Sequence, residues 1–240
     1  MDDRTLPTVT TAYTDLPAPW VPSGVYPPQE DSQLLIDVIW ETGLAAGARV
    51  ADLCTGSGVV AISAAAAGAG KVHGFDICPR AVNCARANVT AAGVDDAVRI
   101  HRGTWSRAAE FGPYDLVVSN PPYVPHCTEE RESIPAAAGP PLAWNAGRDG
   151  RSILDPLCAA VPRLLAPGGA MLLVQSEFSG IERTVHMLSD AGMRSKVVAQ
   201  QYIPFGPVLS ARADWLERVG LMKTGRHRVE KLVVIRADRP

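Results

Sequence analysis

The sequence lacks the features of a disulfide-stabilised or metal-binding protein. Its 240 residues include an odd number of cysteines, and none of them forms a C-x-x-C pair: Cys54, Cys78, Cys84, Cys127 and Cys158. The five histidines are scattered, without the spacing of a ligand pair. We therefore expect reduced, mostly buried thiols, as in cytosolic proteins, and no metal site.

Long apolar runs and a strong charge of one sign are also missing. No stretch of about 18 uncharged apolar residues occurs, and the N-terminus has no apolar segment of the secretory type. These absences predict a cytoplasmic protein without a membrane span. The net charge is −2 and the pI about 6.2, so no overall positive field attracts nucleic acid, and a nucleic-acid partner is not expected.

The first 28 residues contain many Pro, Thr and Asp residues, a composition typical of an irregular leader. Asp31 or Ser32 is placed to cap the helix that follows, in which apolar residues recur at helical spacing. No internal repeat or low-complexity tract interrupts the remainder. We therefore expect a leader over residues 1–28 and a single domain over residues 29–240.

Strand and helix patterns alternate along this domain. We expect strands at residues 49–53, 72–75, 98–101, 115–119, 170–175, 197–202 and 231–236. Helices are expected to begin near residue 32 and to cover residues 59–67, 79–90, 152–165, 181–191 and 209–219, with a long loop at 125–150. This alternation predicts an α/β fold with a doubly wound, mostly parallel seven-stranded sheet and helices on both faces. The last two strands are close in sequence, which favours an antiparallel pair at one edge.

A glycine-containing turn follows the first strand. Gly56 and Gly58 allow close approach of the backbone to a ligand, and the next helix offers free N–H groups to an anionic end. Asp76 ends the second strand, where a carboxylate can accept hydrogen bonds from a ribose diol. Together with Ala61, the same turn satisfies G-x-G-x-x-A, so binding of a nicotinamide cofactor is an alternative.

The fourth strand stops at Asn120-Pro121-Pro122-Tyr123, because proline cannot continue a strand ladder and restricts the residue before it. The Asn120 side-chain carbonyl and the Pro121 backbone carbonyl can accept hydrogen bonds from both N–H groups of a planar NH2 group, while the Tyr123 ring stacks on its face. Such a group is a glutamine amide or an exocyclic base amine. An alternative interpretation of the same four residues is a strand that ends at proline before an ordinary loop. The glycine turn and Asp76, which precede the motif in the expected order, favour a binding site instead.

In this order the motifs resemble a class I S-adenosylmethionine-dependent methyltransferase (Rossmann-like fold) of the HemK/PrmC N5-glutamine family, over about residues 25–236. Asp52-Leu-Cys-Thr-Gly-Ser-Gly58 resembles the cofactor loop, with Cys54 where glycine is usual. Tyr26-Pro-Pro-Gln-Glu-Asp31 resembles the short branch, which has no N-terminal helical domain and modifies release-factor glutamines in archaea and eukaryotes. Residues 143–150 resemble the loop after the motif, and Glu230-Lys-Leu-Val-Val resembles the final strand.

The resemblance implies an S-adenosyl-L-methionine-dependent N-methyltransferase acting on a protein glutamine amide of the release-factor type. The alternative acceptors are other planar NH2 groups, in an adenine of DNA or RNA or in a small-molecule amine or guanidine. A more remote alternative is a nicotinamide-dependent oxidoreductase or a non-catalytic cofactor-binding subunit. The implied partners are a protein substrate such as a peptide release factor, or a small-molecule acceptor, and the small zinc-binding activator subunit of the short branch.

The resemblance also assigns roles to residues. The implied catalytic residues are Asn120, Pro121, Pro122 and Tyr123. Those implied to bind the cofactor are Asp52, Cys54, Thr55, Gly56, Gly58, Asp76, Ile77, Thr104 and Asn120. Those implied to bind the acceptor are Tyr26, Tyr123 and Trp144. Thr104 lies near the position where the family often has an acid that contacts the adenine amine, and its hydroxyl offers an oxygen there.

Overall fold

A computed structural model of the protein describes residues 18–126 and 133–240. Residues 1–17 of the expected leader and residues 127–132 of the expected loop lie outside the described residues. Residues 18–29 contain no helix or strand, and the first helix starts at Glu30. The division into leader and domain stays a prediction. No helix in the described ranges is long and apolar enough to cross a membrane.

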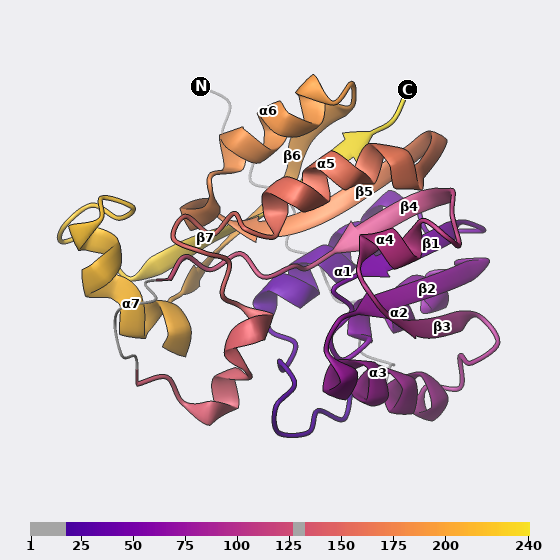
Figure 1. The fold of residues 1–240 in the computed structure, drawn as a ribbon, viewed down its shortest axis with the longest axis horizontal. Helices are drawn as coiled ribbons and strands as arrows, with labels where there is room; N and C mark the ends of the chain where they lie inside the picture. Colours follow the sequence, from indigo (N-terminus) through magenta and orange to yellow (C-terminus); the bar gives the residue numbers. More distant parts are fainter. Residues whose placement is uncertain (1–17, 127–132) are drawn as a thin grey trace.

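A seven-stranded sheet forms the centre of the protein, which confirms the predicted fold class (Figure 1). The strands are β1 (Arg49–Leu53), β2 (Lys71–Asp76), β3 (Val98–Arg102), β4 (Tyr114–Ser119), β5 (Leu165–Ser176), β6 (Arg194–Pro204) and β7 (Val229–Asp238). Their order is β3-β2-β1-β4-β5-β7-β6. The first five strands are parallel, and β7 lies between β5 and β6, antiparallel to both. The predicted antiparallel pair at one edge is therefore present.

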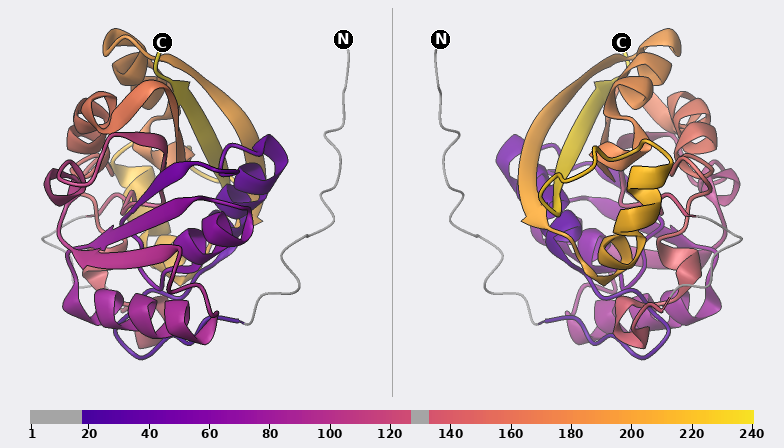
Figure 2. Two further views of the ribbon diagram at one scale, coloured as in Figure 1. Left: turned by 90° about the vertical axis from the view of Figure 1, so that its right-hand side faces the viewer. Right: turned by 90° about the vertical axis from the view of Figure 1, so that its left-hand side faces the viewer.

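Helices cover both faces of this sheet (Figure 2). The contacts α1–α2 and α2–α3 place one group on one face, and α4–α5 and α5–α6 place a second group on the other. The first group is α1 (Glu30–Thr42), α2 (Val59–Ala66) and α3 (Pro79–Ala91), and the second is α4 (Trp105–Ala108), α5 (Leu154–Leu164) and α6 (Ile181–Asp190). Helix α7 (Pro207–Arg218) connects the last two strands, and three short 3-10 turns occupy Ala136–Ala138, Pro141–Ala143 and Glu177–Ser179.

The core lies on both sides of the central strands. Val50 in β1 and Leu116 in β4 are fully buried, because both faces of these parallel strands are covered by helices. Leu35 and Ile39 of α1 belong to the same apolar cluster, and so does Leu157 of α5. The nearly continuous apolar runs of the central strands follow from this double burial.

Several helix and strand bounds differ from the sequence-based expectations; β6 and β7, for example, are longer at both ends than the expected 197–202 and 231–236. Helix α1 begins at Glu30 after Gln29, so the prediction that Asp31 or Ser32 caps it is wrong. Asp31 lies in the first turn, where its carboxylate accepts hydrogen bonds from two tyrosines instead. Strand β5 begins at Leu165 and not at residue 170, because the pairing with β4 includes a register shift after Tyr114. The four-residue helix α4 was not expected, since it is too short to show a hydrophobic period.

The strand pairing brings the predicted motifs to one edge of the sheet. Leu53 at the end of β1 lies opposite Phe75 of β2 on one side and Ser119 of β4 on the other. The residues that follow these strand ends are therefore neighbours. Strand order reverses between β1 and β4, and in doubly wound sheets this reversal is where ligands bind.

Candidate active site

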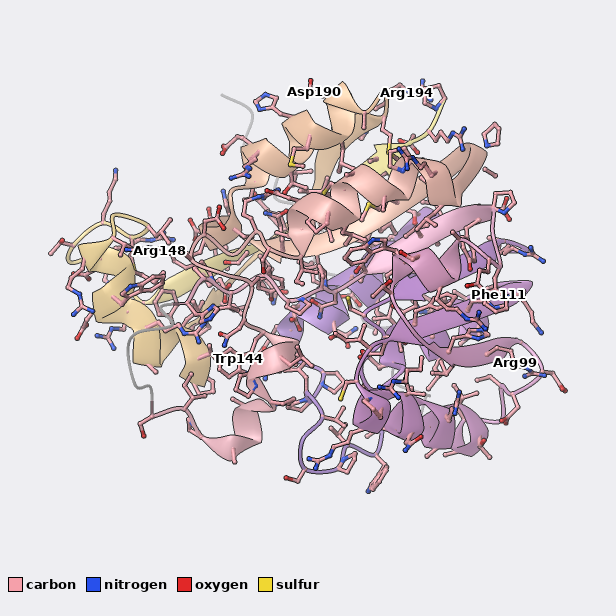
Figure 3. The ribbon with its side chains drawn as sticks, in the orientation of Figure 1. Arg99, Phe111, Trp144, Arg148, Asp190 and Arg194 are labelled. Atoms are coloured by element: carbon pink, nitrogen blue, oxygen red, sulfur yellow. The ribbon has the colours of Figure 1, made fainter. Side chains whose placement is uncertain are left out.

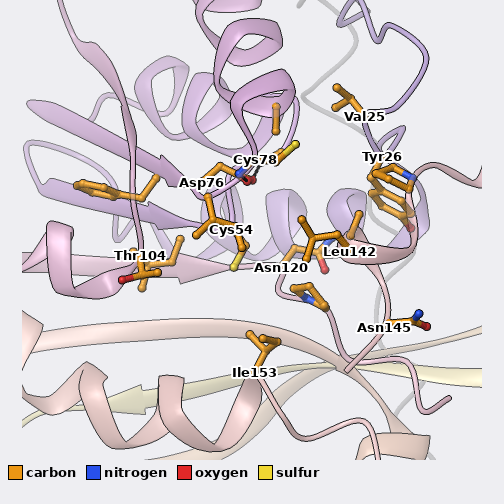
Figure 4. A pocket seen from close by; sticks show the side chains of 18 of the residues that line it. Val25, Tyr26, Cys54, Asp76, Cys78, Thr104, Asn120, Leu142, Asn145 and Ile153 are labelled. Atoms are coloured by element: carbon orange, nitrogen blue, oxygen red, sulfur yellow. Dashed lines mark hydrogen bonds between the residues drawn. The ribbon is translucent and has the colours of Figure 1, made fainter. Parts of the chain in front are cut away.

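A cavity of about 230 Å³ opens beyond the carboxyl ends of the parallel strands (Figure 4). It brings together eight residues of the predicted site: Tyr26, Cys54, Gly56, Asp76, Ile77, Thr104, Asn120 and Pro122. Its remaining wall is largely apolar and includes Leu53, Phe75, Leu142 and Ile153. The cavity is thus a mostly apolar slot with a few polar groups at defined positions, the usual character of a site for a small organic ligand.

Asp76 presents its carboxylate to this cavity in a fixed orientation. The Gly56 N–H donates to one carboxylate oxygen at 3.0 Å, and the Cys78 N–H donates to the other at 2.8 Å. Burial raises the pKa of Asp76, and the backbone hydrogen bonds oppose this effect. Each oxygen retains a further lone pair, so a diol that enters the cavity finds a preoriented acceptor.

Asp52, near the end of β1, is a second buried carboxylate close to the cavity. The Thr55 hydroxyl donates to Asp52 at 2.5 Å, and burial raises the pKa of Asp52 to about 7. Asp52 and Thr55 do not line the main cavity. They line an adjoining space of about 30 Å³ together with Cys54 and Asn120. A cationic group placed there would be stabilised by an acid that burial otherwise keeps partly protonated.

Cys54 and Gly58 have positive φ angles of 62° and 84° in this turn. Gly58 lines none of the cavities at this edge of the sheet, and a Cβ at this position would lie 3.0 Å from the Ala85 Cβ of α3. Packing of α2 against α3 therefore requires this glycine, independently of any ligand. Cys54 replaces glycine in a left-handed conformation, which costs backbone strain. Burial raises the pKa of its thiol, so Cys54 is a neutral part of the wall.

Thr104 and Ile77 also line the main cavity. The Thr104 hydroxyl accepts the Ser106 N–H at 3.2 Å and caps α4, so the unexpected short helix positions this side chain. Ile77 is half exposed although it lines an apolar cavity. A ligand that covers Ile77 would therefore remove apolar surface from water.

Asn120 lies between the main cavity and the adjoining spaces, and Ser32 fixes its amide group. The Asn120 amide nitrogen donates to the Ser32 hydroxyl at 3.1 Å. The side-chain carbonyl is then left as an acceptor for a ligand. Sequence reasoning missed this role of Ser32, because the residue precedes Asn120 by 88 positions and its only local signal is that of a helix start.

Tyr123, Pro121 and Trp144 do not line the main cavity. With Asn120 they line a neighbouring space of about 40 Å³, which also contains Tyr26 and Asp31. We name this space the neck. Asn120 lines both the main cavity and the neck. The neck also contains Tyr26, Tyr123 and Trp144, the residues that the resemblance implies to bind the acceptor.

A pair of tyrosines converges on one carboxylate in the neck. The Tyr123 hydroxyl donates to Asp31 at 3.1 Å, and the Tyr26 hydroxyl donates to the same oxygen at 3.3 Å. Burial, and then the charge of Asp31, raise the pKa of Tyr123 well above its ordinary value. The same two causes raise the pKa of Tyr26. Both hydroxyls are therefore neutral donors that connect the segment before α1 with the motif after β4.

Trp144 is buried and supports the loop that follows the motif (Figure 3). Its backbone carbonyl accepts the Val124 N–H at 2.8 Å, and the Arg212 guanidinium lies 4.7 Å from the centre of its ring. The Arg212 side chain also donates to the Pro125 carbonyl and to Asn145. Helix α7 therefore braces the loop that carries Trp144, a contribution that the sequence did not indicate.

Comparison with known proteins identifies the family. A model of the methyltransferase small domain matches residues 25–135. A protein of Methanocaldococcus jannaschii named "Putative protein N5-glutamine methyltransferase" is 31% identical over 189 residues, which cover 79% of this chain and 91% of the relative. The chain belongs to the protein N5-glutamine methyltransferase family. The identification confirms the resemblance and makes the protein a methyltransferase.

Bacterial relatives differ in length from this methyltransferase. The release factor glutamine methyltransferase of Rhodospirillum rubrum is 40% identical over 60% of this chain and 45% of its own. The ribosomal protein uL3 glutamine methyltransferase of Bradyrhizobium diazoefficiens is 37% identical over 52% and 39%. The chain thus spans less than half the length of these two relatives.

Solved structures show the same fold. One is the Mtq2–Trm112 complex of E. cuniculi, described as responsible for methylation of the eRF1 translation termination factor. It matches with a TM-score of 0.59 and 19% identity over 90% of this chain and 99% of that chain. A precorrin-6y C5,15-methyltransferase from Geobacter metallireducens matches with a TM-score of 0.54 at 15% identity. At these identities the likeness concerns the fold alone.

Proposed function

We propose that this methyltransferase transfers the methyl group of S-adenosyl-L-methionine to the side-chain amide nitrogen of a protein glutamine. The observation that carries the proposal is the position of Asn120. Its amide is fixed by Ser32, and the residue lines both the main cavity and the neck. A group held by its carbonyl from the neck side therefore faces a ligand in the main cavity. The relatives named above as glutamine methyltransferases support this choice of acceptor.

The main cavity and the small space that adjoins it suit the cofactor in three respects. Asp76 offers a preoriented acceptor to the ribose diol, and the apolar walls, with Phe75 and Ile153, accommodate the adenine. Asp52 lines the small adjoining space with Cys54 and Asn120 and offers a carboxylate there for the ammonium of the amino-acid part. The bound cofactor supplies an electrophilic methyl group on a positively charged sulfur. Tyr26 and Leu142 line the cavity from two other segments and would limit access of water.

The chain's own contribution to the reaction is positioning. An amide nitrogen is a poor nucleophile because its lone pair is delocalised into the carbonyl. The Asn120 carbonyl and the Pro121 backbone carbonyl accept hydrogen bonds from its two N–H groups and direct the lone pair toward the cavity. As the new N–C bond forms, the S–CH3 bond of the methyl donor breaks, which leaves the neutral thioether S-adenosylhomocysteine. The nitrogen gains the positive charge that the sulfur loses, its hydrogen bonds to these acceptors strengthen, and one proton then leaves to water. Positioning of this kind supplies several kcal/mol, up to about 7–11 in ideal intramolecular cases.

The remaining residues of the motif stabilise this arrangement. Pro122 lines the cavity as part of the stiff turn that fixes Pro121. Tyr123 donates to Asp31, and Tyr26 closes the same side. Trp144 lines the neck and provides a surface against which an acceptor side chain would pack. No general base is needed before transfer, because the positive charge on nitrogen makes the departing proton acidic.

Calorimetric titration tests the cofactor. S-adenosylmethionine, S-adenosylhomocysteine and NAD are titrated side by side into the purified protein and into an Asn120→Ala variant. We expect the first two to bind both proteins and NAD to bind neither. Methyl transfer should be lost only in the variant. Binding of NAD alone would contradict the proposal, as would full transfer activity of Asn120→Ala.

The acceptor is tested with peptide release factors and ribosomal protein uL3, the proteins named in the relatives. Radiolabelled methyl transfer to each is measured with the chain alone and with a small zinc-binding activator subunit of the Trm112 type. We expect incorporation into a release factor, increased by the activator subunit. Incorporation into adenine of RNA or DNA, with none into these proteins, would overturn the choice of a glutamine acceptor.

A further inference from the structure

A second cavity, of about 370 Å³, lies on the other side of the neck. We call it the acidic cavity, because its polar lining includes Glu30, Asp31 and Glu230. It shares Tyr26, Asp31, Tyr123, Val124 and Trp144 with the neck, so it adjoins the position proposed for the acceptor. No lysine or arginine is among the described residues that line it. Its other walls come from α7 and from the end of β6 and are mostly apolar.

Glu230 is a buried acid with an unused oxygen. Its exposed fraction is 6%, and its Oε1 accepts a hydrogen bond from none of the described residues. Burial, followed by the charges of Asp31, Glu177 and Glu30, raises the pKa of Glu230 to about 7, against the effect of Ser176. A buried acceptor without a partner is costly, so its presence on a cavity wall indicates a ligand that donates to it.

Trp144 contributes the complementary group. Its indole Nε1 is buried, and no described residue accepts its hydrogen bond. The Arg212 guanidinium packs on the ring and donates to the Pro125 carbonyl and to Asn145. The acidic cavity therefore offers acceptors for a cation and one donor for a carbonyl oxygen. An amino-acid residue with a cationic side chain has both of these groups.

We infer that the acidic cavity binds a lysine or arginine side chain of the protein substrate, with Glu230 as its main counter-charge and Trp144 as donor to a substrate carbonyl. The inference rests on the proposed protein substrate. A small-molecule amine would leave Trp144 unpaired, and a nucleic acid would bring phosphates toward three carboxylates. The cation relieves the repulsion among Glu30, Asp31 and Glu230, and its aliphatic stem packs against Phe205 and Leu209.

The test measures binding of small probes, which separates it from methyl transfer. N-acetyl-argininamide, N-acetyl-lysinamide and the neutral N-acetyl-citrullinamide are titrated into protein saturated with S-adenosylhomocysteine. The signal is the NMR resonance of the Trp144 indole N–H, assigned with a Trp144→Phe variant. We expect a saturable shift with argininamide or lysinamide, and the tighter of the two identifies the side chain. Citrullinamide should cause no shift.

The matched variants are Glu230→Gln, which keeps the shape of the side chain, and Glu41→Gln, which removes an exposed carboxylate from α1 away from the cavity. Loss of one charged hydrogen bond should weaken the cationic probe about tenfold or more in Glu230→Gln and leave Glu41→Gln unchanged. Equal binding of citrullinamide, equal affinity in Glu230→Gln, or no binding of either cationic probe would overturn the inference. None of these outcomes depends on whether methyl transfer to glutamine occurs.

Discussion

Tyr123 and Asp31 are 92 positions apart in the sequence, yet the tyrosine hydroxyl donates to the aspartate at 3.1 Å in the buried neck. Tyr26 donates to the same oxygen at 3.3 Å. One carboxylate therefore ties the segment before α1 and the start of α1 to the motif after β4. The hydrogen bond defines the distance between two parts of the proposed acceptor site.

Substitution of Tyr123 by phenylalanine should lower the free energy of unfolding by about 1–3 kcal/mol, because a buried carboxylate loses a donor. The effect should shrink in an Asp31→Asn background, since the two residues interact directly. Urea denaturation of the two single variants and the double variant measures this coupling. The control is Tyr202→Phe, at a 61% exposed site, where a change within about 0.5 kcal/mol is expected. Additive effects of the two neck substitutions would contradict the hydrogen bond.

Gly58→Ala should destabilise the protein through packing as well as backbone strain. A positive φ of 84° costs about 1–2 kcal/mol for a residue with a Cβ, and the Cβ would approach Ala85 to 3.0 Å. Gly93 is the matched control, because its φ is 67° and a Cβ there meets no atom within 4 Å. Urea midpoints of both variants should show a clearly larger loss for Gly58→Ala. Equal losses would mean that the contact with α3 relaxes without cost.

Glu230→Gln should change how stability depends on pH. Burial raises the pKa of Glu230 from its ordinary value of 4.5 to about 7, so the folded protein retains a proton that the unfolded chain releases. Because of this group, the free energy of unfolding of the wild type decreases as the pH rises from 4.5 to 7. The variant should be more stable by up to about 3 kcal/mol above pH 7, with the difference vanishing below pH 4.5.

Unfolding in urea at several pH values measures the difference between the wild type and Glu230→Gln. Taking this difference cancels the contributions of other shifted groups, such as His73, whose pKa burial lowers to about 4. Glu41→Gln, at an exposed site, should show a constant difference from the wild type. A flat difference for Glu230→Gln as well would show that water or a neighbouring group already satisfies its carboxylate.

Ser32→Ala should lower kcat much more than it lowers cofactor affinity. The Asn120 amide loses the acceptor that fixes its orientation, and misplacement of a positioning group costs about 10- to 100-fold in rate. Steady-state kinetics with a release factor and calorimetry with S-adenosylhomocysteine separate the two quantities. Ser189→Ala, an exposed site on α6, serves as the control with wild-type kinetics. An unchanged kcat in Ser32→Ala would show that Asn120 is oriented by its backbone alone.

Much of the fold was predictable because its signals are local. The strand before Asn120 ends at two prolines, and the glycine turn follows an apolar strand that is buried on both faces. Parallel strands place their carboxyl ends at one edge, so the juxtaposition of Cys54, Asp76 and Asn120 follows from the strand pattern. The resemblance then supplied the chemistry of these positions.

The parts that were missed depend on contacts between distant segments. Asp31 looks like a helix cap in the sequence, and only the fold brings Tyr123 beside it. Ser32 carries no motif of its own, since a serine near the start of a helix is common. Glu230 was expected only as the start of the final strand, and nothing local in the sequence indicates that it lines a cavity. Gly58 was expected to let the backbone approach a ligand. The structure shows instead that a side chain at this position would meet Ala85 of α3, so the packing of α2 against α3 requires glycine.

The most direct test of the account is to locate the transferred methyl group. A peptide release factor is incubated with this protein, the activator subunit and S-adenosylmethionine, and the modified residue is mapped by tandem mass spectrometry. We predict the added mass of one methyl group on a single glutamine side-chain amide, absent when Asn120→Ala replaces the wild type. Methylation at any other residue type, or equal modification by the variant, would contradict the assignment of Asn120 as the acceptor clamp.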